Sequence, residues 1–131
     1  MVDGGFDPLH AGHIAYFEAA AGLGLPLLCN VSSDDWIALK HVPLLPQAER
    51  GVVIEAIRWI DYVHLSHTPT VEVLRRLEPR YYAKGADWDG RLPEEEAALC
   101  AERGIEIVYL DTVLNSSIAI LERYADGSPG D

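Results

Sequence analysis

Short apolar runs alternate along the chain with longer segments in which apolar and polar positions are mixed. The short runs are typical of strands that are buried on both faces, and the mixed segments indicate helices. The predicted strands are the end of a first strand at residues 1–3, then 25–31, 61–66, 81–83 and 105–110. The predicted helices are 11–21, 46–59, one that begins at Thr68-Pro69, one from Leu92-Pro93 to Gly104, and one that begins at Ser116 or its neighbour.

This alternation predicts an α/β fold in which five strands form one parallel sheet with helices on both faces. The chain shows neither an internal repeat nor a long linker, and its 131 residues suit one domain. We therefore expect a single domain over residues 1–125 and a disordered tail over 126–131. In such sheets ligands bind outside the carboxyl ends of the strands, so we expect the binding residues in the loops that follow strands.

Composition narrows the classes of partner. The formal net charge of -11 argues against nucleic acid or an anionic membrane as a partner, because both require basic patches. The sequence has neither an apolar run of about 20 residues nor a secretory signal, so we expect a cytoplasmic protein. Cys29 and Cys100 fall inside predicted regular elements, which predicts two buried free thiols.

The loop after the first strand carries the clearest chemistry. Glycines let a backbone approach a phosphate closely, and the start of the following helix offers free amide groups. His10 and His13 are three residues apart, so both imidazoles can face one anion and stabilise charge on a reacting phosphorus. A glycine turn with two surface histidines is the structural alternative. The candidate nucleotide-binding residues of this loop are Gly4, Gly5, Phe6, Asp7 and Gly12.

Residues 4–13, GGFDPLHAGH, resemble the GxFDxxHxGH signature of the cytidylyltransferase-like nucleotidyltransferase superfamily, and every fixed position is matched. Its members include glycerol-3-phosphate cytidylyltransferase and the nucleotidyltransferase domain of ADP-heptose synthase. The resemblance implies a Rossmann-like fold of the HxGH nucleotidyltransferase type, with His10 and His13 binding the triphosphate. It also implies that an acceptor phosphate attacks the α-phosphorus, that pyrophosphate leaves, and that Mg²⁺ usually assists.

The resemblance extends to later loops. It implies that Lys40 joins the two histidines in the catalytic set and that Arg50 contacts phosphates, with Asp34 on the substrate side. Alone, Lys40 and Arg50 would read as solvated surface charges. Segment 84–91 resembles both the KGGDY segment of heptose-type enzymes and the DWxGK segment of glycerol-phosphate enzymes. The nucleotide-binding candidates in this segment are Lys84, Gly85 and Asp87. Its substrate-binding candidates are Trp88 and Arg91.

Residues 115–118 resemble the STT-type motif of the family at a helix start, where hydroxyl groups grip the β- and γ-phosphates. Ser116 and Ser117 are the candidates, and ordinary helix capping by Ser116 is the rival reading. Leu114 and Ile118 depart from the family pattern. Asp111 also stands where glycerol-phosphate enzymes carry arginine, which favours the adenylyl branch slightly over the cytidylyl branch.

The predicted activity is transfer of AMP or CMP from ATP or CTP to a sugar phosphate or polyol phosphate. The predicted partners are these small molecules, with no nucleic acid or membrane, and the resemblance adds a possible homodimer. The altered segment 114–118 keeps a second reading open, a nucleotide-binding module without catalysis or a degenerate paralogue.

Overall fold

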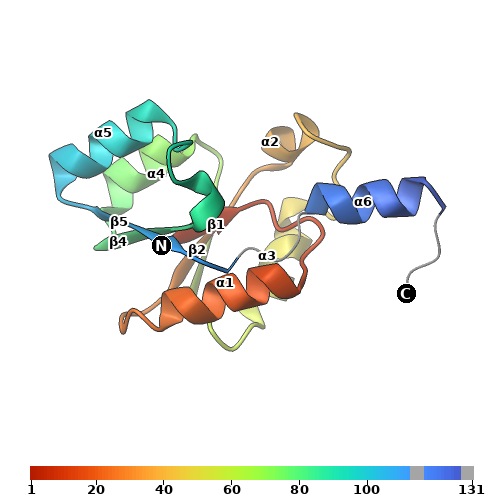
Figure 1. Ribbon diagram of the computed structural model, residues 1–131, viewed down its shortest axis with the longest axis horizontal. Helices are drawn as coiled ribbons and strands as arrows, with labels where there is room; N and C mark the ends of the chain where they lie inside the picture. Colours follow the sequence, from red (N-terminus) through yellow and green to blue (C-terminus); the bar gives the residue numbers. More distant parts are fainter. Residues whose placement is uncertain (113–116, 128–131) are drawn as a thin grey trace.

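The computed structural model describes residues 1–112 and 117–127, except for the side chain of Ile118. Strands and helices alternate from the start of the chain (Figure 1). The strands are β1 (Val2–Gly4), β2 (Leu28–Val31), β3 (Tyr62–Leu65), β4 (Tyr81–Gly85) and β5 (Glu106–Leu110). The helices are α1 (Ala11–Ala21), α2 (Asp34–Ala38), α3 (Gln47–Glu55), α4 (Thr70–Leu77), the 3₁₀ turn η1 (Ala86–Trp88), α5 (Glu94–Arg103) and α6 (Ser117–Ala125).

All strand pairs in the described residues are parallel, but the strands form two sheets. One sheet has the order β1-β2-β3 and the other pairs β4 with β5. The predicted single five-stranded sheet is therefore wrong in detail. Among the described residues, the backbone hydrogen bonds between the two sheets are those of Met1, with its nitrogen 2.7 Å from the Tyr81 carbonyl and its carbonyl 2.9 Å from the Ala83 nitrogen. Two bonds made by one residue join the sheets edge to edge without forming a ladder.

Apolar cores on both faces confirm that helices cover both sides of the strands. Phe17 and Ala20 of α1 and Ile54 of α3 pack against Cys29 and Val31 of β2. On the opposite face, α4 and α5 pack against Tyr82 of β4. Figure 1 shows the same layering, with α1 and α3 on one side and α4 and α5 on the other. Helix α6 extends away from this body.

The elements depart from expectation in two places. The sequence pattern predicts no element between residues 31 and 46, whereas Ser33 caps the short helix α2, its Oγ accepting from the backbone nitrogen of Trp36 at 3.2 Å. Helix α3 ends at Glu55, four residues before the predicted end. The expected helix start at Ser116 and the last residues of the predicted tail, 128–131, lie outside the described residues.

The two cysteines are free and buried, as the sequence predicts. Burial raises the pKa of both thiols above the ordinary value. In the described residues, none of the helices has the length and apolar character needed to cross a membrane.

Candidate active site

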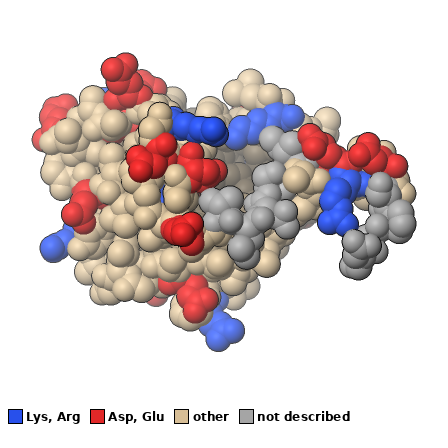
Figure 2. All heavy atoms as spheres, viewed as in Figure 1, with Lys and Arg blue, Asp and Glu red and all other residues tan. Residues whose placement is uncertain are grey.

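A cavity of about 840 Å³ opens at the carboxyl ends of the strands, where parallel α/β sheets bind their ligands. Figure 2 shows this side of the molecule hollowed beside α2, with Lys and Arg side chains on the upper rim of the hollow. Most residues that the sequence singled out line the cavity. They are Gly4, Gly5, Phe6, Asp7, His10, Gly12, His13, Lys40, Lys84, Gly85, Asp87, Trp88 and Ser117.

Two histidines form a reciprocal cap at the start of α1. The Nδ1 atom of His10 accepts a hydrogen bond from the Gly12 nitrogen at 3.1 Å, and the Nδ1 atom of His13 accepts from the His10 nitrogen at 3.2 Å. The rings stack with their centroids 3.7 Å apart. Because a backbone N–H can only donate, each Nδ1 is unprotonated, and each neutral ring carries its proton on Nε2.

Burial keeps both imidazoles neutral. It lowers the pKa of His10, and together with the nearby His10 it lowers the pKa of His13 to about 4. The Nε2 atom of His10 is buried and has no hydrogen-bond partner among the described residues. A buried donor without a partner costs about 1–3 kcal/mol, so this position favours a ligand with acceptor oxygens. The pair therefore offers two N–H donors that are set before any ligand arrives.

The glycines of the loop make room for this arrangement. A Cβ atom at Gly4 would lie 3.0 Å from the ring of Phe6, and one at Gly5 would lie 3.1 Å from the Ile37 side chain. The Phe6 ring in turn packs edge-on against His13, with centroids 5.0 Å apart. A larger residue at Gly4 would therefore displace the aromatic ring that packs against His13, and one at Gly5 would press on Ile37.

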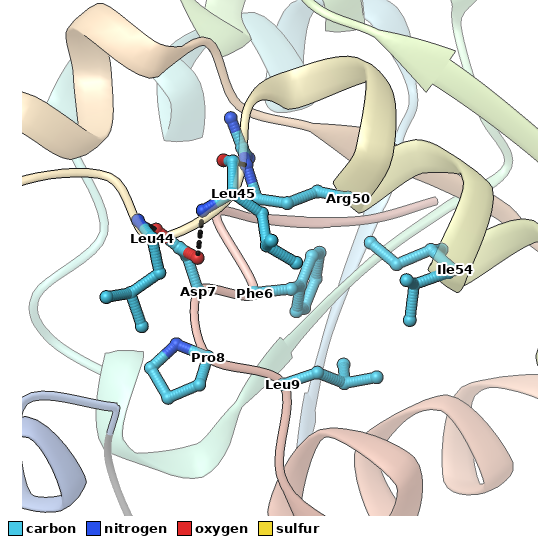
Figure 3. Close-up of a pocket in the computed structure, with 9 residues that line it drawn as sticks. Phe6, Asp7, Pro8, Leu9, Leu44, Leu45, Arg50 and Ile54 are labelled. Carbon is cyan, nitrogen blue, oxygen red and sulfur yellow. Dashed lines mark hydrogen bonds between the residues drawn. The ribbon is translucent and has the colours of Figure 1, made fainter.

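Asp7 connects the loop to the segment before α3. Its carboxylate is buried and accepts from the backbone nitrogens of Leu44 at 2.7 Å and Leu45 at 3.3 Å (Figure 3). These residues surround a second, mostly apolar cavity of about 120 Å³, closed on one side by α3. Asp7 thus holds two loops together as well as bordering the large cavity.

Arg50 lies beneath the loop rather than on the cavity wall, unlike the expectation of a phosphate contact. Its side chain is 1% exposed and pairs with Asp34 at 2.7 Å. Its guanidinium also donates to three backbone carbonyls, those of Leu45 at 3.1 Å, Gly5 at 2.9 Å and Ser32 at 2.8 Å. Arg50 and Asp34 therefore join the loops after β1 and β2 to α3, and neither lines the large cavity.

The segment after β4 brings a lysine and an aromatic ring to the opposite wall. The Nζ atom of Lys84 lies 2.9 Å from Oδ1 of Asp3 and 4.2 Å from the centroid of the Trp88 ring. Gly85 and Asp87 line the same wall, whereas Arg91 is exposed outside it. Lys84 is thus a buried cation with a partner already in place.

The remaining predicted residues lie on the rim. Lys40 is exposed just after α2, with its Nζ atom 5.7 Å from the centroid of the Trp36 ring. The Oγ atom of Ser117 donates to the Pro8 carbonyl at 2.8 Å, which ties the start of α6 to the histidine loop. Ser116 lies outside the described residues.

Sequence reasoning missed a polar group on the cavity floor. Asp3 accepts from Thr70 Oγ1 at 3.0 Å, and Tyr82, whose hydroxyl lies 3.3 Å from the same carboxylate, also bonds Glu96 at 2.7 Å. Asn30, on the neighbouring strand, is 1% exposed. Polar residues inside short apolar strands were the available signal, since a strand buried on both faces has little reason to carry Asp or Asn.

In the part of the chain that the structure describes, the cavity offers few protein ligands for the expected Mg²⁺. The described residues contain no group of three or more His, Cys, Asp or Glu that could hold a metal. Mg²⁺ is usually bound by one or two carboxylates together with substrate phosphates. The exposed Asp35 and Asp87 line the cavity, so the donor set fits an ion that arrives with a triphosphate.

Comparison with curated proteins gives relatives of two kinds. The chain is 35% identical over 134 residues to the bifunctional protein HldE of Trichlorobacter lovleyi, covering 96% of this chain and 27% of that protein. It is 32% identical over 107 residues to the FAD synthase of Halomicrobium mukohataei, covering 81% of this chain and 74% of that protein. The chain therefore spans about a quarter of the HldE protein, at 27%, and most of the FAD synthase.

A solved structure and a family model complete the comparison. The crystal structure of the lipopolysaccharide core biosynthesis protein from Thermoplasma volcanium matches with a TM-score of 0.73 at 24% identity, covering 87% of this chain and 96% of that one, which shows a shared fold. The family model described as cytidylyltransferase-like matches residues 1–122. The chain belongs to the cytidylyltransferase-like family of nucleotidyltransferases.

Proposed function

We propose that this chain transfers an adenylyl group from ATP to a sugar phosphate or polyol phosphate and releases pyrophosphate. One observation carries the proposal: the Nδ1 atoms of His10 and His13 accept backbone hydrogen bonds, which leaves an Nε2–H donor on each ring of the cavity-lining pair. Preset donors stabilise negative charge on a phosphorus centre without reorganising during the reaction.

The other cavity residues have supporting roles in this proposal. Lys40 on the rim meets the phosphate tail, and Ser117 meets it from the start of α6. Lys84 and Trp88 border the acceptor, while Gly4 and Gly5 let the backbone approach the phosphates. When bound, Mg²⁺ neutralises charge on the leaving pyrophosphate, and Asp35 or Asp87 would hold it.

Transfer needs only positioning and charge stabilisation. The acceptor phosphate oxygen forms a bond to the α-phosphorus as the bond to the bridging oxygen breaks, and the electron pair leaves with pyrophosphate. ATP is favoured over CTP because FAD, the product named for the FAD synthase relatives, contains AMP joined through a pyrophosphate. CTP remains the second candidate, since the family model is described as cytidylyltransferase-like.

Pyrophosphate release tests the proposal directly. ATP and CTP, each with Mg²⁺, are incubated with a panel of sugar and polyol phosphates, and acceptor-dependent release is measured. His13→Ala should lower turnover by about 10²–10³, the scale for losing one charge-stabilising donor. Arg103→Ala is the control: its exposed side chain pairs with Glu78 at 2.9 Å outside the cavity lining, and turnover should stay within about twofold.

Either of two results would contradict the proposal. Turnover that survives His13→Ala unchanged removes the assignment of the histidine pair. Nucleotide binding seen as a rise in melting temperature, with silence across the acceptor panel, favours the module without catalysis instead.

A further inference from the structure

Three polar side chains stand in one row across the first sheet. Asp3, Asn30 and His64 are in register on β1, β2 and β3. Successive side chains of a strand point to opposite faces, and the neighbours of Asn30, Cys29 and Val31, enter the core beneath α1 and α3. The row therefore lies on the α4 face, at the floor of the large cavity, which Asp3 and Asn30 line.

A chain of hydrogen bonds sets the orientation of the Asn30 amide. The Nη2 atom of Arg76, on α4, lies 2.9 Å from Nε2 of His64, and Nδ1 of His64 lies 2.8 Å from Oδ1 of Asn30. A guanidinium can only donate, so Nε2 accepts and Nδ1 carries the proton. His64 donates that proton to Asn30, so the amide oxygen of Asn30 must face His64. The Nδ2 amino group of Asn30 then faces away from His64.

This amino group is a donor without use inside the protein. Asn30 is 1% exposed, lines the cavity, and makes no Nδ2 hydrogen bond to any described residue. Asn30 lines the cavity, whereas His64 is not among the described residues that line it. Because the amide oxygen faces His64, Nδ2 is the amide atom that a ligand in the cavity can reach. A buried amide donor normally has a partner, which here would come from the molecule that fills the cavity.

Asp3, the neighbour of Asn30 on β1, supplies a hydrogen-bond acceptor beside this donor. The Asp3 carboxylate, one strand away, accepts from Lys84 and Thr70 and lines the same floor. Adjacent strands lie about 4.8 Å apart, so a donor and an acceptor stand side by side. A pair of adjacent hydroxyl groups matches this arrangement, since one oxygen can accept while the other donates.

We propose that Asn30 recognises a vicinal diol of the bound molecule, donating from Nδ2 to one hydroxyl while Asp3 accepts from the next. His64 and Arg76 act as positioning residues that hold the amide in this orientation. The inference rests on the proposed function. The diol has two possible sources, the ribose of the nucleotide and the polyol or sugar part of the acceptor.

Deoxy probes separate these sources. The nucleotide arm measures the Kd of ATP, 2′-deoxy-ATP and 3′-deoxy-ATP by calorimetry. The acceptor arm measures KM for glycerol 3-phosphate against 3-hydroxypropyl phosphate, and for ribose 5-phosphate against 2-deoxyribose 5-phosphate. In one arm the wild type should prefer the diol by about tenfold, the value of one well-made hydrogen bond.

Variants test the amide and its support. Asn30→Leu should reduce the preference for the diol probe over the deoxy probe to within about twofold, because neither probe then meets the amide donor. Asn30→Asp keeps an oxygen for His64 and replaces the amide donor with a charged acceptor, so it should show the same loss of preference even if the leucine variant folds poorly. His64→Leu should reduce the preference, whereas His64→Gln, which keeps one donor and one acceptor, should restore it.

The outcomes separate failure of the Asn30 inference from failure of the proposed function. An unchanged diol preference in Asn30→Leu and Asn30→Asp, or an equal weakening of diol and deoxy probes, overturns the inference while leaving the proposed function intact. A wild type without any preference does the same. A wild type that neither binds nucleotide nor releases pyrophosphate removes the proposed function and the inference with it.

Discussion

Arg50→Met removes the guanidinium that joins three backbone segments beneath the histidine loop. The side chain is 1% exposed, and its loss leaves the carbonyls of Gly5, Ser32 and Leu45 without their donor. Three unsatisfied acceptors at about 1 kcal/mol each give about 3 kcal/mol, and breaking a buried ion pair costs up to about 5 kcal/mol. Because Asp34 is half-exposed and can be solvated, the lower end of this range is expected.

The assay is urea unfolding followed by circular dichroism, with thermal unfolding as a second measure. For a chain of this size about 3 kcal/mol corresponds to a fall of about 12 °C in Tm. Arg50→Lys should recover little of this loss, because one ammonium cannot reach acceptors on three segments. Arg103→Met is the matched control, since its ion pair with Glu78 is exposed and worth less than about 1 kcal/mol.

A different pattern would refute this reasoning. If Arg50→Met keeps the stability of the wild type within about 1 kcal/mol and instead raises the KM for the nucleoside triphosphate, the guanidinium serves the ligand, as the sequence suggested.

Three further predictions concern the floor and loop of the site. The pKa of His13 is lowered from 6.5 to about 4, so near pH 5 the unfolded chain binds a proton at this residue and the folded chain does not. The free energy of unfolding should therefore fall as the pH is lowered from about 6.5 to 4, by at most about 3 kcal/mol. Urea unfolding of His13→Gln should show a shallower fall over the same pH range. Gly4→Ala places a Cβ against the Phe6 ring and should lower the free energy of unfolding by about 1–3 kcal/mol in the same urea assay. An unchanged urea midpoint would show that the ring moves aside without cost. Tyr82→Phe removes the hydroxyl that bonds Glu96 at 2.7 Å and should cost about 1–2 kcal/mol at pH 7, with a smaller cost at a pH where Glu96 is protonated; an equal cost at both pH values would contradict it.

Local patterns predicted much of the fold because the strands are short and mostly apolar. The α/β class, the parallel pairing and helices on both faces follow from periodicity and connection length. Helix α2 was missed because Ser33 and Asp34 read equally well as a turn or as a helix start, and only five residues follow the cap. The division into two sheets reflects the missing ladder between β1 and β4, whose backbones are joined, among the described residues, by the two hydrogen bonds of Met1, and no pattern of side chains indicates this.

Spacing along the sequence indicates which candidate side chains lie together where their contacts are local, but not where the contacts are long-range. His10 and His13 lie on one helical turn, so spacing alone brings their rings together. The environment of Arg50 is set by loops 5, 18 and 45 residues away in the sequence, which a lone basic residue cannot reveal. Asn30 and His64 meet only through strand pairing, so their contact required knowledge of the register.

The wall of the large cavity is shared between the two sheets. The histidine loop belongs to the sheet of β1, β2 and β3, while Lys84 and Trp88 belong to the sheet of β4 and β5. The seam between the walls is crossed by the two Met1 hydrogen bonds and by the buried ion pair of Lys84 with Asp3 at 2.9 Å. A ligand that touches both walls acts as a staple across the seam, and the Ala83 amide, which bonds the Met1 carbonyl, reports its tightening through slower hydrogen exchange.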